Sequence, residues 1–208
     1  MTRSLPQNLV RLDRSFYARP VLTVARECIG KILVRKLGNR WLAGRIVETE
    51  AYRGPEDRAA HSFGGRRTLR TEVMFGPAGH AYMFLIYGMY WNFNIVTGRE
   101  GDPHAVLVRA IEPLLGIGVM AKNRGLAKES PTLTNGPGKL CQALGLNRAH
   151  YGLDLCRAEL FLADGPPAPV ARSPRIGVDY AGIWASKPWR FYDPKSRHVS
   201  KLRAAHGA

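Results

Sequence analysis

Two apolar runs on either side of one tight-turn signal constrain the fold of this chain more than any other feature. They are KILVRKL at residues 31–37 and RWLAGRIVETEAY at residues 40–52, and the pair Gly38-Asn39 separates them. Both runs are rich in residues that favour strands, and a two-residue connection of this composition is typical of a β-hairpin. We therefore predict an antiparallel hairpin here, and a fold built around an antiparallel sheet.

The rest of the chain predicts short elements of both kinds. An apolar face formed by Leu22, Val24 and Cys28 predicts a helix from Pro20 to about Ile29. Similar patterns predict two strands within residues 80–96 that meet near Gly88, strands at residues 104–113 and 159–164, and helices at residues 114–125 and 139–146. We find no internal repeat, low-complexity tract or long linker.

The expected fold class is α+β, with one compact mixed domain over residues 20–200. In this domain helices surround a curved, mainly antiparallel β-sheet. Residues 1–19 are expected to form an N-terminal arm, and residues 201–208 a basic C-terminal tail. Glycine and polar residues dominate between residues 53 and 79, which predicts a long ordered loop with a helical turn near residues 69–74. Loops of that length in compact domains are usually functional.

The chain is strongly basic. It carries 31 Lys and Arg against 16 Asp and Glu, a formal charge of +15, while 45% hydrophobic residues allow a folded core. A basic folded domain favours a polyanion as partner, with nucleic acid as the first candidate and an anionic membrane as the second. The sequence has no lysine-rich amphipathic helix and no apolar run of about 18 residues. We therefore expect a nucleic-acid partner and no membrane partner.

Cysteine use and the N-terminal sequence predict a cytoplasmic protein. Cys28, Cys141 and Cys156 are widely spaced and form neither a disulfide framework nor a zinc-binding pattern. The first residues, MTRSLPQNL, lack the apolar segment of a secretion signal. A reducing cytoplasm or nucleoid is the expected location.

Four carboxylates lie within the fourteen residues of ETEAYRGPEDRAAH, residues 48–61. The two-residue period of a strand puts Ile46, Glu48, Glu50 and Tyr52 on one face, with the two carboxylates roughly 7 Å apart. Burying both without partners costs several kcal/mol, so they are exposed to solvent, paired with arginine, or functional. Beside them, Tyr52 would let an aromatic ring face a flat substrate while a carboxylate activates a water molecule.

A metal site is the alternative interpretation of the same stretch. Glu48, Glu50, Glu56, Asp57 and His61 could together hold a divalent cation for a nuclease. Their spacing matches no recognised ligand motif. The metal site is therefore the weaker prediction.

A second unusual stretch is FLIYGMYW, residues 84–91. A hairpin packed in the core explains most of its apolar residues. Tyr87, Met89 and Tyr90, however, surround the predicted turn, where large side chains project from the fold. On a basic surface such side chains can enter a base step, stack on single-stranded bases, or form a protein interface.

Four strings, taken in their order along the chain, resemble the alkyladenine (3-methyladenine) DNA glycosylase family. They are VETEAYRGPEDRAAHS (47–62), MFGPAGHAYMFLIYGMYWNFNIV (74–96), GPGKLCQALGLN (136–147) and KPWRFY (187–192). The first string is far longer and more specific than a chance motif. The resemblance covers residues from about 24 to 192, nearly the whole predicted domain.

The resemblance implies an enzyme that removes alkylated and deaminated purines from duplex DNA by hydrolysing the N-glycosidic bond. Such enzymes flip the damaged nucleotide out of the helix, are monofunctional, use no metal or cofactor, and have neither the helix-hairpin-helix nor the uracil glycosylase fold. We expect a monomeric bacterial member that acts in base excision repair on double-stranded DNA containing damaged purines. A metal-dependent DNA endonuclease and a non-catalytic protein that binds damaged DNA remain as alternatives.

The resemblance also implies roles for individual residues. Glu50 would be the general base that activates water, and Arg109 would help to hold that water. The other acids of the stretch, Glu48, Glu56 and Asp57, would brace the loop that carries His61. The pocket for the flipped base would be lined by Tyr52, His61, Phe84 and Asn94. DNA would be contacted by Tyr87, which fills the gap left in the duplex, and by Met89, Tyr90, Arg66, Thr68 and Lys139.

Phe84 is a departure from the family pattern. The best-known vertebrate members have a tyrosine at the corresponding place in the pocket. Stacking on the ring survives this change, but one hydroxyl hydrogen bond is lost. We therefore expect an altered range of neutral lesions rather than a loss of activity.

Overall fold

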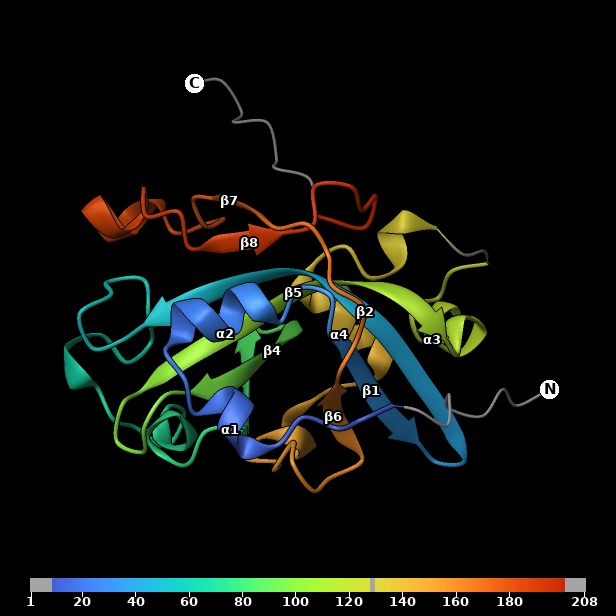
Figure 1. The fold of residues 1–208 in the computed structure, drawn as a ribbon, viewed down its shortest axis with the longest axis horizontal. Coiled ribbons are helices and arrows are strands. Elements are labelled where there is room, and N and C mark those ends of the chain that lie inside the picture. Colours follow the sequence, from blue (N-terminus) through green and yellow to red (C-terminus); the bar gives the residue numbers. More distant parts are fainter. Residues whose placement is uncertain (1–8, 128–129, 201–208) are drawn as a thin grey trace.

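The computed structural model describes residues 9–127 and 130–200, so residues 1–8 of the expected arm and the expected tail at 201–208 lie outside the described part. Within it, eight strands form one antiparallel sheet in the order β3-β4-β5-β2-β1-β6, with β8 paired to β2 and β7 paired to β8. Figure 1 shows the long β2 running across the sheet. The strands are β1 (Ile32–Leu37), β2 (Arg40–Arg53), β3 (Ala81–Ile86), β4 (Tyr90–Thr97), β5 (His104–Leu115), β6 (Leu160–Ala163), β7 (Ala171–Ser173) and β8 (Arg190–Tyr192).

Short helices surround this sheet, which confirms the predicted mixed α+β domain. The antiparallel pairing of β1 with β2 confirms the predicted hairpin at Gly38-Asn39. The helix expected at residues 114–125 begins only at Ile117, because Leu115 still pairs with Ala43 in the sheet. Across the described residues, no helix is long and apolar enough to cross a bilayer. The helices are α1 (Arg14–Tyr17), α2 (Val21–Glu27), α3 (Ile117–Asn123) and α4 (Pro137–Leu144), with 3₁₀ turns η1 (Phe63–Gly65), η2 (Glu72–Phe75), η3 (Pro131–Leu133), η4 (Arg148–His150) and η5 (Asp179–Trp184).

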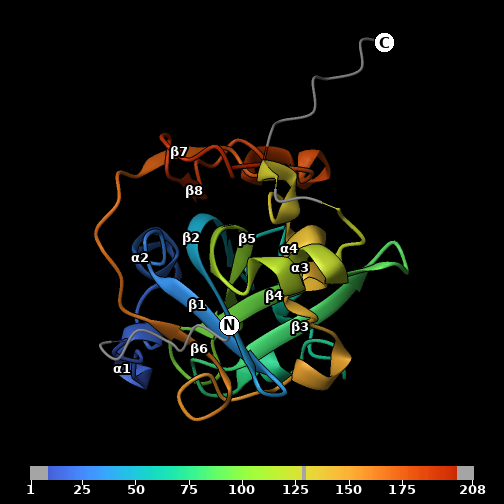
Figure 2. The ribbon, with the colours of Figure 1, turned by 90° about the vertical axis from the view of Figure 1, so that its right-hand side faces the viewer.

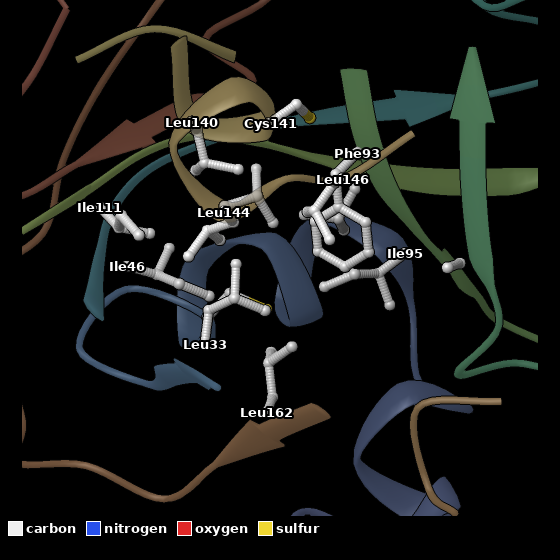
Figure 3. Close-up of a cluster of buried hydrophobic side chains, with 14 of the residues drawn as sticks. Leu33, Ile46, Phe93, Ile95, Ile111, Leu140, Cys141, Leu144, Leu146 and Leu162 are labelled. Atoms are coloured by element: carbon white, nitrogen blue, oxygen red, sulfur yellow. The ribbon is translucent and has the colours of Figure 1, made fainter. Parts of the chain in front are cut away.

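The main hydrophobic core lies between the sheet and helices α2 and α4. Leu140 and Leu144 of α4 meet Phe93 and Ile95 of β4 there, as Figure 3 shows. The described part of the expected arm, residues 9–19, is packed against this domain. Tyr17 of α1 is fully buried in the core.

Strand β2 has neighbours on both edges along most of its length. β5 pairs along one edge, while on the other edge β1 pairs as far as Arg45 and β8 pairs at residues 48–50. Figure 2 shows β7 and β8 lying together above β2 and β5. The segment of β2 that carries the two glutamates is therefore enclosed by the sheet itself.

The register of β2 against β5 shifts on both sides of Glu48. As a result Ile46 and Ala51, an odd number of residues apart, both pack in the main core. The prediction that Ile46 shares a face with Glu48 and Glu50 is therefore wrong. A bulge reverses the alternation of a strand, and it turns both glutamates toward Arg109 instead.

Candidate active site

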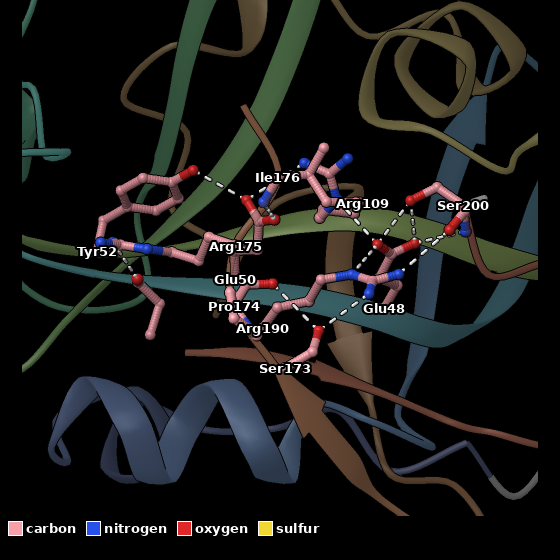
Figure 4. A network of polar contacts seen from close by, with 11 residues as sticks. Glu48, Glu50, Tyr52, Arg109, Ser173, Pro174, Arg175, Ile176, Arg190 and Ser200 are labelled. Atoms are coloured by element: carbon pink, nitrogen blue, oxygen red, sulfur yellow. Dashed lines mark hydrogen bonds and ion pairs between the residues drawn. The ribbon is translucent and has the colours of Figure 1, made fainter. Parts of the chain in front are cut away.

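Glu50 is fully buried, and both of its carboxylate oxygens are hydrogen-bonded. Oε1 accepts from the Ile176 backbone N at 2.8 Å, and Oε2 accepts from Tyr52 Oη at 2.9 Å and from Arg109 Nη1 at 3.2 Å. Figure 4 shows these donors arriving from different segments of the chain. Together they offset the cost of burying a negative charge.

Glu48 is a second fully buried carboxylate on the same strand. Its Oε1 accepts from Arg109 Nε at 3.0 Å and from Arg190 Nε at 2.7 Å. The backbone N and the Oγ of Ser200 lie 2.7 and 2.6 Å from its Oε2. We had expected Glu48 to brace the loop that carries His61, and this expectation is wrong. Glu48 joins β5, β8 and the C-terminal segment instead.

Arg109 lies on β5 and binds one oxygen of each glutamate. Burial by itself lowers the pKa of Arg109, but Glu50 and Glu48 together raise it above its usual value. The Arg109 side chain keeps 10% of its surface exposed, whereas the two glutamate side chains keep none. Arg109 is thus the most exposed member of this ion-pair group, since the side chain of Arg190 keeps only 4%.

Asp57 braces the loop that follows β2, as expected. It is fully buried and accepts hydrogen bonds from the backbone N of Arg53 and of Ala59, at 3.1 and 3.0 Å. Nη1 and Nη2 of Arg175 lie 2.5 and 2.9 Å from its two oxygens. This two-point geometry is typical of strong arginine–carboxylate pairs. Glu56, by contrast, is exposed and pairs with Arg53.

The string GPEDRAAHS folds the loop back against the sheet. Gly54 leaves room for Ser62, since a Cβ at this position would lie 2.0 Å from Ser62 Oγ. Ser62 Oγ donates to the carbonyl of Pro103, just before β5, at 2.9 Å. The two alanines of the string are buried beside it. This packing carries His61 to the face of the sheet that holds Tyr82.

Arg175 also lies over the ring of Tyr52, with its Cζ 4.7 Å from the ring centroid. One face of this ring is therefore covered by a guanidinium that Asp57 neutralises. Burial first, and then the neighbouring Glu50, raises the pKa of Tyr52 well above its usual range. The hydroxyl consequently stays protonated and donates to Glu50.

The antiparallel register places two predicted site residues, Glu50 and Asn94, in one row across the sheet. Glu50 pairs with Leu107 of β5, Leu107 with Asn94 of β4, and Asn94 with Tyr82 of β3. Directly paired residues point to the same face, and two strand spacings separate Asn94 from Glu50 by about 10 Å. Asn94 is buried, with Nδ2 donating to the Tyr82 carbonyl at 3.2 Å.

His61 lies against the aromatic rings of β3. It meets Phe84 edge-to-face at a centroid distance of 4.5 Å, while Nδ1 lies 2.7 Å from Tyr82 Oη and Nε2 lies 2.8 Å from Arg70 Nη2. Arg70 Nη2 also lies 3.3 Å from Nδ1, and because arginine can only donate, the neutral ring accepts from Arg70. Burial, with a contribution from Arg70, lowers the pKa of His61 to about 4.

Acid should destabilise the fold through His61. Its folded pKa of about 4 lies below the ordinary value of 6.5, so the unfolded chain binds the proton first. The contribution of neutral His61 to the free energy of unfolding is therefore full above about pH 6.5. It is lost as the pH falls toward 4, which lowers the free energy of unfolding by about 3 kcal/mol. Urea unfolding of the wild type and of His61→Gln across this range measures it. Since His104 and His150 also have lowered pKa values, the comparison between the two proteins isolates His61, and equal pH dependences would contradict the prediction.

A pocket of about 360 Å³ opens beside His61. An adjoining depression of about 480 Å³ extends toward the β3–β4 hairpin, and Arg70 lines both. Volumes of this size suit a small ligand such as a nucleobase. The first pocket is lined by His61, Phe63, Thr68, Tyr180 and the arginines Arg58, Arg66 and Arg70, and the second by Leu69, Phe84, Leu85, Trp91 and Tyr151 among others. The predicted residues Arg66 and Thr68 thus lie beside the histidine.

The β3–β4 hairpin projects the large side chains that the sequence placed at its turn. Tyr87, Met89 and Tyr90 are 82%, 68% and 47% exposed. Tyr87 has a φ of 52° and Gly88 a φ of 67°, as in a type I′ turn, which asparagine and glycine fill far more readily than tyrosine. Packing therefore does not explain why an aromatic residue is held at this exposed tip in a strained conformation.

Lys139 lies beside this hairpin, in the first turn of α4. Tyr90 packs directly on Gly138, where a Cβ would lie 3.0 Å from Tyr90 Cβ. Lys139 Nζ donates to Asn135 Oδ1 at 2.9 Å. The structure therefore groups Tyr87, Met89, Tyr90 and Lys139 at the hairpin, and Arg66 and Thr68 at the pocket of His61.

The five residues of the alternative metal site do not converge. Glu48, Glu50 and Asp57 are each paired with buried arginines, Glu56 is exposed, and His61 lies against aromatic rings. Among residues 9–127 and 130–200, no three acidic, histidine or cysteine side chains are arranged to hold an ion.

Several residues of this site had no local signal in the sequence. Arg175 is 118 residues from Asp57, and Arg190 is 142 residues from Glu48. Arg190 falls within the string KPWRFY, but nothing in that string marks it as the partner of Glu48, and Arg175 lies outside the four strings. Ser200 and the Ile176 backbone N were not identified at all, since any residue can present a backbone donor.

Comparison with known proteins shows the family of the chain. A family model described as methylpurine-DNA glycosylase matches residues 15–197. A relative from Myxococcus xanthus is 53% identical over 193 residues, covering 91% of this chain and 93% of its own length. Relatives from Desulfitobacterium hafniense and Methanocella arvoryzae are 49% and 52% identical, covering 91% of this chain and 98% and 96% of their own lengths. All three carry the name 3-methyladenine DNA glycosylase. The chain belongs to the methylpurine-DNA glycosylase family.

Proposed function

We propose that this protein is a monofunctional DNA glycosylase of base excision repair, which hydrolyses the N-glycosidic bond of alkylated or deaminated purines in double-stranded DNA. The observation that carries the proposal is Glu50, a buried carboxylate in the same sheet row as Asn94 and beside Tyr52. The names of the relatives and the charge of +15 support DNA as the substrate. The protein would act as a monomer in the cytoplasm.

The target bond cannot be reached inside a stacked duplex, so the damaged nucleotide has to be extruded at a cost of a few kcal/mol. Tyr87, at the exposed hairpin tip, would offset part of this cost by filling the space that the base leaves. The extruded base would stack between Tyr52 and the pair His61 and Phe84. A cationic alkylated purine gains about 0.5–2 kcal/mol from such rings.

Glu50 would accept a proton from the water that attacks C1′ as the purine departs. Its negative charge also stabilises the cationic sugar that develops in the transition state. In the free protein Glu50 has no exposed surface, because Tyr52 Oη and Arg109 cover Oε2. We infer that substrate entry opens the Tyr52 hydrogen bond and that Arg109 then holds the incoming water. Hydrolysis consumes only water beside the damaged nucleotide, so the reaction needs no redox or group-transfer co-substrate.

A duplex carrying one 3-methyladenine or hypoxanthine, incubated with the protein in EDTA, tests the proposal. We expect free purine and a strand that breaks only on alkaline treatment. A strand cut without alkali, and only when metal is present, would identify a metal-dependent endonuclease. Retention of the duplex without loss of the base would identify a non-catalytic damaged-DNA binding protein.

Tyr87→Asn should separate stability from function. Asparagine tolerates a positive φ, so the free energy of unfolding should rise by about 1 kcal/mol as backbone strain is relieved. Base release from a lesion-bearing duplex should fall, because the variant loses the aromatic ring at the tip. Urea unfolding and single-turnover kinetics measure the two effects, and undiminished base release would contradict the wedge role of Tyr87. Tyr180→Asn, at another exposed tyrosine outside the hairpin, is the stability control.

A further inference from the structure

The reaction proposed above assigns no role to Glu48, although this side chain is as deeply buried as that of Glu50. It is bound on one side by Arg109 and on the other by Arg190 and Ser200. Arg190 Nη2 donates in turn to the Ser200 carbonyl at 3.2 Å. Keeping a charge at this position requires several long-range contacts, which a neutral side chain would not need.

Arg109 is shared between the two glutamates. Its Nε lies 3.0 Å from Glu48 Oε1, and its Nη1 lies 3.2 Å from Glu50 Oε2. A guanidinium with only one carboxylate in reach tends to bind both oxygens of that carboxylate. Glu48 prevents this arrangement, because it holds the Nε side of Arg109 away from Glu50.

We propose that Glu48 is a positioning residue for the reaction. By holding Arg109 to a single hydrogen bond with Glu50, it leaves the Glu50 carboxylate able to take a proton from water. This inference rests on the function proposed above. The C-terminal segment takes part in the same arrangement, since Ser200 fixes the far oxygen of Glu48.

The charged groups around Glu48 and Glu50 determine how the loss of the Glu48 charge affects Glu50. Arg109 from β5 and Arg190 from β8 face Glu48. Arg109 and the Tyr52 hydroxyl face Glu50, with Arg175 near enough to interact through its charge. Removing the charge of Glu48 leaves Glu50 as the remaining acid for Arg109. Glu50 is then held charged more strongly and accepts a proton less readily.

Glu48→Gln tests the inference, because it removes the charge and keeps the shape. We expect single-turnover base release to slow by about 10- to 100-fold through the misplaced Arg109, with unchanged affinity for the lesion-bearing duplex. The acid limb of the pH–rate profile should move to lower pH, and Glu48→Asp should recover part of the rate. Glu112→Gln is the matched control, since Glu112 lies on β5 with Arg109 but pairs with Arg45 instead. Its base release should equal that of the wild type.

A folded Glu48→Gln with wild-type base release would overturn the inference, as would a parallel loss of rate and lesion affinity. If that variant does not fold, Ser200→Ala decides, because it keeps every charge and removes one donor to Glu48. Its rate should fall by about 5-fold, and an unchanged rate would also overturn the inference. Failure of the proposed function is distinguishable, since the wild type itself would then release no base.

Discussion

Glu50→Gln is expected to abolish base release while the affinity for a lesion-bearing duplex is retained. The amide has the shape of the carboxylate but cannot accept a proton from water or stabilise a cationic sugar. Losing a general base costs about 100- to 10,000-fold in rate. The amide oxygen can take the place of Oε2 and keep the bonds from the Tyr52 hydroxyl and Arg109, while the NH₂ group in place of Oε1 loses the bond from the Ile176 N. Two of the three donors are therefore kept, and the site should keep most of its shape.

Single-turnover kinetics with excess protein measure the loss, and a gel-shift titration measures the affinity. Glu56→Gln is the matched control, because Glu56 belongs to the same acidic stretch but is exposed and pairs with Arg53. That control should release base at the wild-type rate. Excision by Glu50→Gln at a rate close to the wild type would show that another group activates the water.

Arg175→Met is expected to have the largest effect on stability. It leaves Asp57 buried without its cation, and breaking one side of a buried ion pair costs about 3–5 kcal/mol. Both side chains of the pair have no exposed surface, so solvent cannot replace the lost partner. Base release should also fall, because the loop that carries His61 and the ring of Tyr52 both depend on Arg175.

Urea unfolding measures this loss, and a double variant isolates its cause. Asp57→Asn combined with Arg175→Met removes both charges, so it should be more stable than Arg175→Met alone. Lys36→Met, which breaks the exposed pair between Lys36 and Glu159, should cost no more than about 1 kcal/mol. If the double variant is no more stable than Arg175→Met, the uncompensated charge of Asp57 is not the cause.

The hairpin at Gly38-Asn39 and the turn at Gly88 were both predictable, because turn residues and strand patterns act over a few neighbouring positions. The resemblance predicted Glu50 as the general base and Arg109 as a residue that helps to hold the water, and the structure brings their side chains within 3.2 Å of each other. The alternation around Glu48 was predicted incorrectly. The register shifts that reverse it depend on β5, which begins more than fifty residues later in the chain.

The antiparallel sheet, the basic character of the molecule, the family and the tyrosine at the hairpin tip could all be predicted from the sequence alone. These properties follow from local patterns, from composition, and from strings that are long enough to be specific. The way in which each buried acid is neutralised follows instead from the three-dimensional fold. Glu48 is paired with Arg190 and Asp57 with Arg175, because the segment that contains β7 and β8 returns to the sheet, where β8 pairs with β2. Such pairings depend on three-dimensional register, and no local pattern in the sequence records it.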